Sequence, residues 1–287
     1  MTASLPTPLI GASTLLARLG TPDWPVLLDC SFDLADTGAG EAAYIAGHLP
    51  GARYAHLDRD LSGPKTARGA IDGGRHPLPT REALAATLAR WGIGAGTPVV
   101  AYDAQGGAYA ARAWWLLRWL GHQAIAVLDG GVAAWQATGG PLEQGLTPHA
   151  PAAEGYPLRP AAMPAVDASE LLAAPGRLLV IDARAPERYR GDVEPLDAQA
   201  GHIPGARNRF FKDNLDPNGR FRPAAELRRV FQAFGATPGQ VVHQCGSGVT
   251  ACHNLLAMEL AGLPGSALYP GSWSEWSADP ARPVARS

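Results

Sequence analysis

The sequence contains two copies of the same ordered set of short segments, and this duplication limits the possible fold more than any other feature. The segment GHLPGARY in the first copy recurs as GHIPGARN in the second. The corresponding pairs are 27–34 with 180–187, 47–54 with 201–208, 99–121 with 241–262, and 128–135 with 269–276. Four matches in one order indicate that a whole domain was duplicated, because solenoid repeats are much shorter.

The two copies are separated by a proline-rich segment. Residues 141–164 carry six prolines and show no sustained helical or alternating pattern, which is typical of a linker. A chain of 287 residues also exceeds the usual size of a single domain. We therefore predict a first domain at residues 8–141, a linker at 142–161 and a second domain at 162–287.

Each half alternates between short β-rich runs and helical patterns. Residues 81–93 and 224–236 show apolar side chains at the spacing of an amphipathic helix. The β-rich runs between such patterns are VLLD, PVVAYD, AIAVLD, RLLVID and QVVHQC. Strands separated by helices predict an α/β domain with a mainly parallel sheet and helices on both faces.

Composition excludes several classes of partner. The net charge is −2 and only 17% of residues are charged, so no electrostatic feature predicts binding to nucleic acid or to an acidic membrane surface. No apolar run approaches the ~20 residues that a membrane span needs, and the N-terminus has no signal-peptide pattern. Three cysteines are too few for a disulfide scaffold. We expect a reduced, cytoplasmic protein that binds neither nucleic acid nor membrane.

Cys245 lies in a glycine-rich turn between the predicted strand QVVHQ and a predicted helix. Ligands of parallel sheets bind beyond the carboxyl ends of the strands, where this turn lies. Gly246 and Gly248 allow successive backbone N–H groups to curl into an anion-binding nest, which the helix N-terminus reinforces. Such surroundings favour a thiolate over a thiol. Cys245 is therefore the predicted nucleophile, whereas Cys30 and Cys252 are expected to be structural.

The sequence of this loop disfavours two other chemistries. A cysteine phosphatase would need an arginine six positions after the cysteine, and that position is Ala251. A zinc site built from His243, Cys245, Cys252 and His253 lacks the usual ligand spacing. We expect neither a metal nor a cofactor.

These residues resemble the two-domain rhodanese-type sulfurtransferases over nearly the whole chain. CGSGVTA at 245–251 is similar to the active loop of the 3-mercaptopyruvate sulfurtransferase branch, and GHIPGA and GSWSEW are similar to flanking signatures of the family. The resemblance implies two tandem rhodanese-like domains, of which the second is catalytic. Asp103 occupies the position of Cys245 in the first copy, which implies that the first domain is not catalytic.

The resemblance further implies a reaction in two steps. Cys245 takes a sulfur atom from a small donor, forms a persulfide and passes the sulfur to cyanide or to a thiol such as thioredoxin or a low-molecular-weight thiol. It assigns catalytic roles to Ser247, Asp58 and His76, with the last two contributed by the first domain. Donor binding is assigned to Arg188 and to the loop residues Gly246, Gly248, Val249 and Thr250.

The identity of the donor stays open at this point. Gly246, Ser247 and Gly248 are neutral, which favours monoanionic 3-mercaptopyruvate over dianionic thiosulfate by at least about tenfold, given the usual strength of charge-assisted hydrogen bonds. Leu196 follows the pair Glu194-Pro195, at a position where the family often has a second arginine. The leucine should raise the KM for 3-mercaptopyruvate and so reduce its advantage over thiosulfate. The alternatives are a thiosulfate:cyanide sulfurtransferase, a non-catalytic sulfur-carrier module, and a thiol-dependent reductase or phosphatase.

Overall fold

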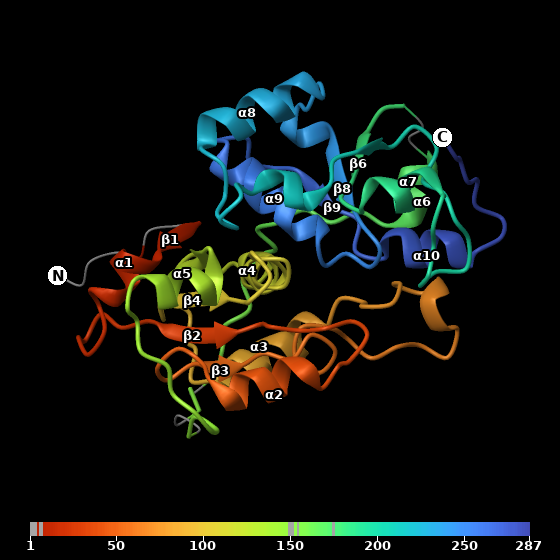
Figure 1. The fold of residues 1–287 in the computed structure, drawn as a ribbon. Helices are drawn as coiled ribbons and strands as arrows, with labels where there is room; N and C mark the ends of the chain where they lie inside the picture. Colours follow the sequence, from red (N-terminus) through yellow and green to blue (C-terminus); the bar gives the residue numbers. More distant parts are fainter. Residues whose placement is uncertain (1–4, 6–7, 149–151, 154, 174–175) are drawn as a thin grey trace. The chain divides into compact units, whose positions relative to one another are not determined.

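The structure is a computed structural model, and it describes residues 5, 8–148, 152–153, 155–173 and 176–287. The predicted linker at 142–161 lies partly outside the described residues. The chain forms two compact units, each built around its own parallel sheet (Figure 1). Two α/β units with parallel sheets confirm the predicted fold class. The domain bounds stay a prediction.

The first unit contains a five-stranded sheet in the order β1-β5-β4-β2-β3, with every pairing parallel. Leu27 and Val100 belong to a core shared with the helices α1, α2 and α5, while their neighbours Leu28 and Ala101 are equally buried on the other face. The strands are Leu9–Gly11 (β1), Val26–Asp29 (β2), Arg53–Tyr54 (β3), Val99–Tyr102 (β4) and Ile125–Asp129 (β5). The helices are Ala12–Leu16 (α1), Ala39–Ala46 (α2), Arg81–Arg90 (α3), Ala110–Trp119 (α4) and Gly131–Ala137 (α5).

The second unit contains a four-stranded parallel sheet in the order β7-β6-β8-β9. Val180 and Val242 face a core that includes Trp273, whereas His243 faces the opposite side, where its ring meets Phe231. The strands are Leu179–Asp182 (β6), Arg207–Asn208 (β7), Val241–Gln244 (β8) and Ala267–Leu268 (β9). The helices are Ala168–Ala173 (α6), Pro186–Arg190 (α7), Ala224–Ala233 (α8), Ala251–Leu260 (α9) and Ser272–Ala278 (α10), with 3₁₀ turns at Gly69–Ile71, Phe211–Asn214 and Pro238–Gln240.

The two amphipathic helices predicted from sequence are present but end three residues early. The segments 81–93 and 224–236 form α3 and α8, which stop at Arg90 and Ala233. Shortly after each end, Gly92 and Gly235 adopt left-handed φ angles of 68° and 73°. A glycine in this conformation is the usual terminator of a helix, because a side chain there would be strained.

The units do not coincide with the two halves of the sequence, because one segment of each half packs with the other unit. Residues 62–78 belong to the second unit, and residues 217–221 belong to the first. Both segments follow the repeated GHxPGAR motif of their own half, so the exchange is reciprocal. The exchange places His76 in the unit that contains Cys245.

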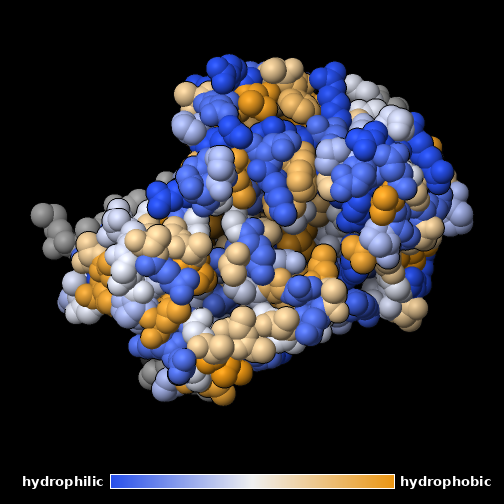
Figure 2. Space-filling model, in the orientation of Figure 1, coloured by the Kyte–Doolittle hydropathy of each residue, from blue (hydrophilic) through white to orange (hydrophobic). Residues whose placement is uncertain are grey.

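The surface carries no continuous apolar belt in the view of Figure 2, where apolar patches are interspersed with hydrophilic residues. Within the described part of the chain, no helix is long and apolar enough to cross a membrane.

Candidate active site

The loop after β8 holds Cys245 against the start of α10. The backbone N–H of Cys245 donates to Oγ of Ser272 at 3.1 Å, and its carbonyl accepts from the N–H of Trp273 at 3.0 Å. Gly248 has a φ of 73°, and a Cβ atom there would lie 2.3 Å from the carbonyl oxygen of Pro270. Glycine is therefore required at 248 by both conformation and space, as its position in the sequence suggested.

The equivalent loop of the first unit shows what this backbone can bind. One oxygen of Asp103 accepts N–H groups of Gln105 and Gly107, both at 2.8 Å. The other accepts those of Tyr109 at 2.8 Å and Ala110 at 2.9 Å. Four backbone donors thus surround one carboxylate at the end of β4 and the start of α4. The nest predicted around Cys245 thus has a counterpart in the first copy, in a loop that is one residue longer.

Ser247 and His76 form a polar pair beside Cys245. His76 Nδ1 lies 2.7 Å from Oγ of Ser247, and the two residues are 3% and 5% exposed. The loop segment that carries His76 is fixed to α10, because the backbone N–H of Arg75 donates to Oγ of Ser274 at 2.9 Å. Two residues that the resemblance singled out, 171 positions apart in the sequence, are thus brought into contact.

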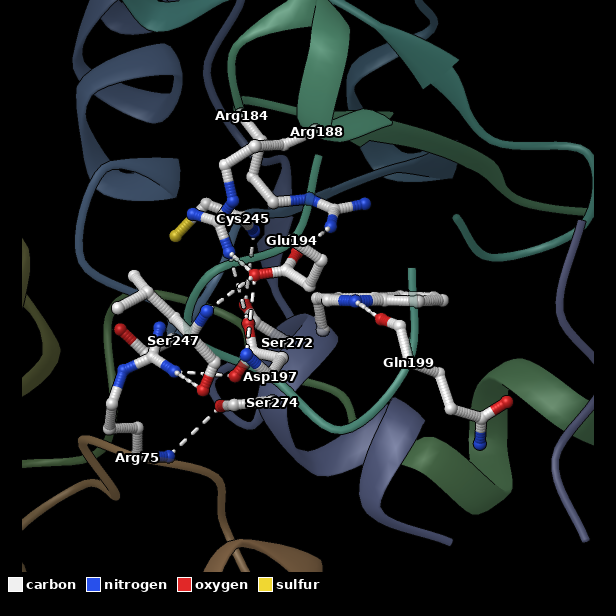
Figure 3. A network of polar contacts seen from close by, with 12 residues as sticks. Arg75, Arg184, Arg188, Glu194, Asp197, Gln199, Cys245, Ser247, Ser272 and Ser274 are labelled. Carbon is white, nitrogen blue, oxygen red and sulfur yellow. Dashed lines mark hydrogen bonds and ion pairs between the residues drawn. The ribbon is translucent and has the colours of Figure 1, made fainter. Parts of the chain in front are cut away.

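Arg188 extends from the short helix α7 towards the same loop. Its Nη1 and Nη2 lie 3.5 and 3.8 Å from the place a Cβ atom would occupy on Gly246. Behind it, Nη2 contacts Oε1 of Glu194 at 2.6 Å and Oδ2 of Asp197 at 3.1 Å (Figure 3). Both carboxylates are buried, so they fix the guanidinium while it remains 19% exposed. Burial raises the pKa of Asp197, and the cation of Arg75 opposes this rise.

Arg75 and Arg184 belong to this network although sequence reasoning did not select them. Arg184 forms a buried ion pair with Asp182 at 2.7 Å and reaches Glu194 at 3.3 Å. Arg75 contacts Asp197, and its Nη2 lies 3.1 Å from the Cβ position on Gly246. The sequence feature that could have indicated Arg75 as a site residue is that it directly precedes His76. The residues that follow Cys245 are neutral, as the sequence shows, and the guanidinium groups of Arg75 and Arg188 reach this loop from other segments.

The remaining predicted residues are placed as follows. Val249 and Thr250 lie in the loop between β8 and α9, which begins at Ala251, and Val249 is buried. Asp58 lies in the first unit, where its backbone N–H donates to Nδ1 of His56 at 3.1 Å, and its role stays a prediction.

Cys30 and Cys252 are buried, as Cys245 is, and their structural role stays a prediction. Burial raises the pKa of the Cys30 thiol well above its usual value. Cys252 points its sulfur to the carbonyl of Gly248 at 3.3 Å, within the first turn of α9. Among the residues that the structure describes, no three His, Cys, Asp or Glu side chains gather as a metal site would require.

Comparison with known proteins agrees with this architecture. The rhodanese-like domain family matches the chain twice, at residues 11–138 and 165–279. A probable 3-mercaptopyruvate sulfurtransferase of Pseudomonas aeruginosa is 49% identical over 282 residues, covering 96% of this chain and 97% of that protein. A putative thiosulfate sulfurtransferase of Mycobacterium tuberculosis is 41% identical, covering 97% of this chain and 96% of that protein.

A solved structure gives the same result. The 3-mercaptopyruvate sulfurtransferase of Leishmania major superposes with a TM-score of 0.83 at 30% identity, covering 96% of this chain and 76% of that one. The chain therefore belongs to the rhodanese-like family, as a sulfurtransferase with two tandem rhodanese-like domains.

Proposed function

We propose that the protein transfers sulfur from 3-mercaptopyruvate through a persulfide on Cys245. The thiolate of Cys245 attacks the donor sulfur, and a sulfur–sulfur bond forms as the carbon–sulfur bond of the donor breaks. The electron pair of that bond leaves as the enolate of pyruvate, which then takes a proton. An acceptor thiolate or cyanide next attacks the outer sulfur and regenerates the Cys245 thiolate.

The observation that carries this proposal is the contact between Ser247 and His76 beside Cys245. A hydroxyl that is hydrogen-bonded to an imidazole can deliver a proton to a leaving group, and the enolate requires one. Thiosulfate would leave as sulfite, which needs no proton. The pair therefore favours a donor with a carbon leaving group.

The loop backbone supplies the second requirement of the reaction. In the first unit the equivalent loop binds a carboxylate through four N–H groups. In the second unit the same arrangement would stabilise the anionic sulfur of Cys245 and of its persulfide. Gly246, Gly248, Val249 and Thr250 act through this backbone, and Arg188 binds the carboxylate of the donor.

Thiosulfate is the second candidate donor. Two guanidinium groups near Gly246 would suit a dianion, and one relative carries the name of a putative thiosulfate sulfurtransferase. The acceptor is proposed to be cyanide or a thiol such as thioredoxin or a low-molecular-weight thiol. A cytoplasmic location stays a prediction.

Side-by-side kinetics with both donors tests the proposal. We expect a higher kcat/KM with 3-mercaptopyruvate than with thiosulfate, and we expect His76→Ala to reduce turnover with 3-mercaptopyruvate more than with thiosulfate. Equal or better turnover of thiosulfate by the wild-type protein would overturn the assignment of the donor. Equal losses with both donors would show that His76 does not serve the leaving group.

A further inference from the structure

Arg75 lies beside the Cys245 loop although it comes from the first half of the chain. Its Nη2 is 3.1 Å from the Cβ position on Gly246, and its side chain is 22% exposed. The main chain around it is fixed, because the N–H of Arg75 and that of Gly73 donate to Ser274 and Glu275 of α10. The guanidinium is therefore held at the loop by anchored backbone.

Asp197 joins Arg75 to Arg188. Oδ1 of Asp197 contacts Nη1 of Arg75, and Oδ2 contacts Nη2 of Arg188 at 3.1 Å (Figure 3). The carboxylate is 2% exposed, so it lies behind two partly exposed cations. Within the described residues, the buried Nε of each of these arginines has no hydrogen-bond partner. The contacts with described residues use Nη1 of Arg75 and Nη2 of Arg188, so Nη2 of Arg75 and Nη1 of Arg188, which lie nearest to Gly246, retain N–H donors for a ligand.

Gly246 provides space between these two cations. It does not have the left-handed φ that would require glycine, unlike Gly248. The nearest atoms to a side chain at 246 would be nitrogens of Arg75 and Arg188, at 3.1 to 3.8 Å. An acceptor atom at that position would therefore lie within or close to hydrogen-bonding distance of both guanidinium groups, one residue from Cys245.

We propose that Arg75 binds the sulfur donor and, together with Arg188, holds its anionic group over Gly246. This inference rests on the proposed function, because it assigns the binding of an anionic sulfur donor. Asp197 serves as the positioning residue that sets the spacing of the two cations. Planar guanidinium groups suit a carboxylate because they offer parallel N–H donors.

The test compares Arg75→Gln and Arg75→Lys with Arg190→Gln as the matched control. Arg190 also forms an ion pair, with Asp192, but its side chain is 46% exposed on α7 and makes none of the contacts with the Cys245 loop described above. With 3-mercaptopyruvate we expect Arg75→Gln to raise KM at least about tenfold with kcat changed less than about threefold, since one lost charge-assisted contact has this effect. Arg75→Lys should recover part of the loss, and Arg190→Gln should match the wild type.

A binding measurement separates donor binding from catalysis. In protein that carries Cys245→Ser, calorimetric titration with pyruvate should show a Kd raised at least about tenfold by Arg75→Gln, with an unchanged thermal unfolding midpoint. A fall in kcat with unchanged KM and Kd, or wild-type values of all three, would overturn the role of Arg75. Failure of the wild type to form a persulfide with 3-mercaptopyruvate would instead refute the proposed function.

Discussion

Alanine should destabilise the protein at Gly248 but not at Gly246, although the two glycines are two residues apart in one loop. At Gly248 the φ of 73° is unfavourable for alanine, and the new Cβ would lie 2.3 Å from a carbonyl oxygen of the main chain. The strained φ alone costs roughly 1–2 kcal/mol, and the collision adds to it, so we expect a loss of more than about 2 kcal/mol.

At Gly246 the outcome differs because the neighbours are the ends of flexible arginine side chains. The closest is Nη2 of Arg75 at 3.1 Å, which can move by a few tenths of an ångström. Alanine at a compatible φ stabilises a protein by about 0.4–1 kcal/mol, so Gly246→Ala should fold at least as well as the wild type. The added methyl group occupies the proposed donor position, so its KM should rise.

Thermal unfolding and steady-state kinetics on the two variants check this reasoning. At about 2–4 °C per kcal/mol, Gly248→Ala should lower the midpoint by roughly 4–8 °C and lose activity. Gly246→Ala should keep the wild-type midpoint and show a raised KM. The same midpoint for both variants, with activity retained by Gly248→Ala, would refute the loop conformation on which the site depends.

Three further outcomes are expected. Cys245→Ser should abolish persulfide formation, while Cys30→Ser and Cys252→Ala retain most activity in a donor assay, and sulfur transfer by Cys245→Ser would contradict this. His76→Ala should impair turnover without unfolding the protein, as a joint measurement of rates and circular dichroism at the assay temperature can show. Burial lowers the pKa of His243 from 6.5 to about 3. Between these two pH values only the unfolded chain binds a proton at this residue, so the free energy of unfolding falls as the pH drops from 6.5 towards 3. This residue should lower the free energy of unfolding by about 2 kcal/mol at pH 5 relative to pH 8. Urea unfolding of His243→Leu should therefore depend less on pH than that of the wild type.

The fold could be predicted from sequence because its determinants are local or repeated. The duplicated segments predicted the two α/β units that the structure contains. The glycine-rich turn predicted Cys245 as the nucleophile, and that role stays a prediction. Helix ends were misjudged because the apolar pattern continues past Gly92 and Gly235, whose left-handed conformation stops the helices. Short strands such as β1 and β9 carry too few residues to show a pattern.

The cationic surroundings of the site could not be predicted in the same way. Arg75 reaches the loop only because residues 62–78 pack with the second unit, and no local pattern encodes that exchange. The sequence has Leu196 where the family often has a second arginine, and from this we expected a weaker preference for 3-mercaptopyruvate over thiosulfate. The structure has a second guanidinium from a distant segment, and the carbonyl of Leu196 lies 3.5 Å from its Nη1.

A single-turnover experiment without an acceptor tests the central claim most directly. Wild-type protein mixed with excess 3-mercaptopyruvate should release one pyruvate per chain, and the peptide that contains Cys245 should gain the mass of one sulfur atom, about 32 Da. Added thiol or cyanide should remove that mass and allow a second turnover. Pyruvate release without the added mass, or the added mass on Cys30 or Cys252 instead, would contradict transfer through a Cys245 persulfide.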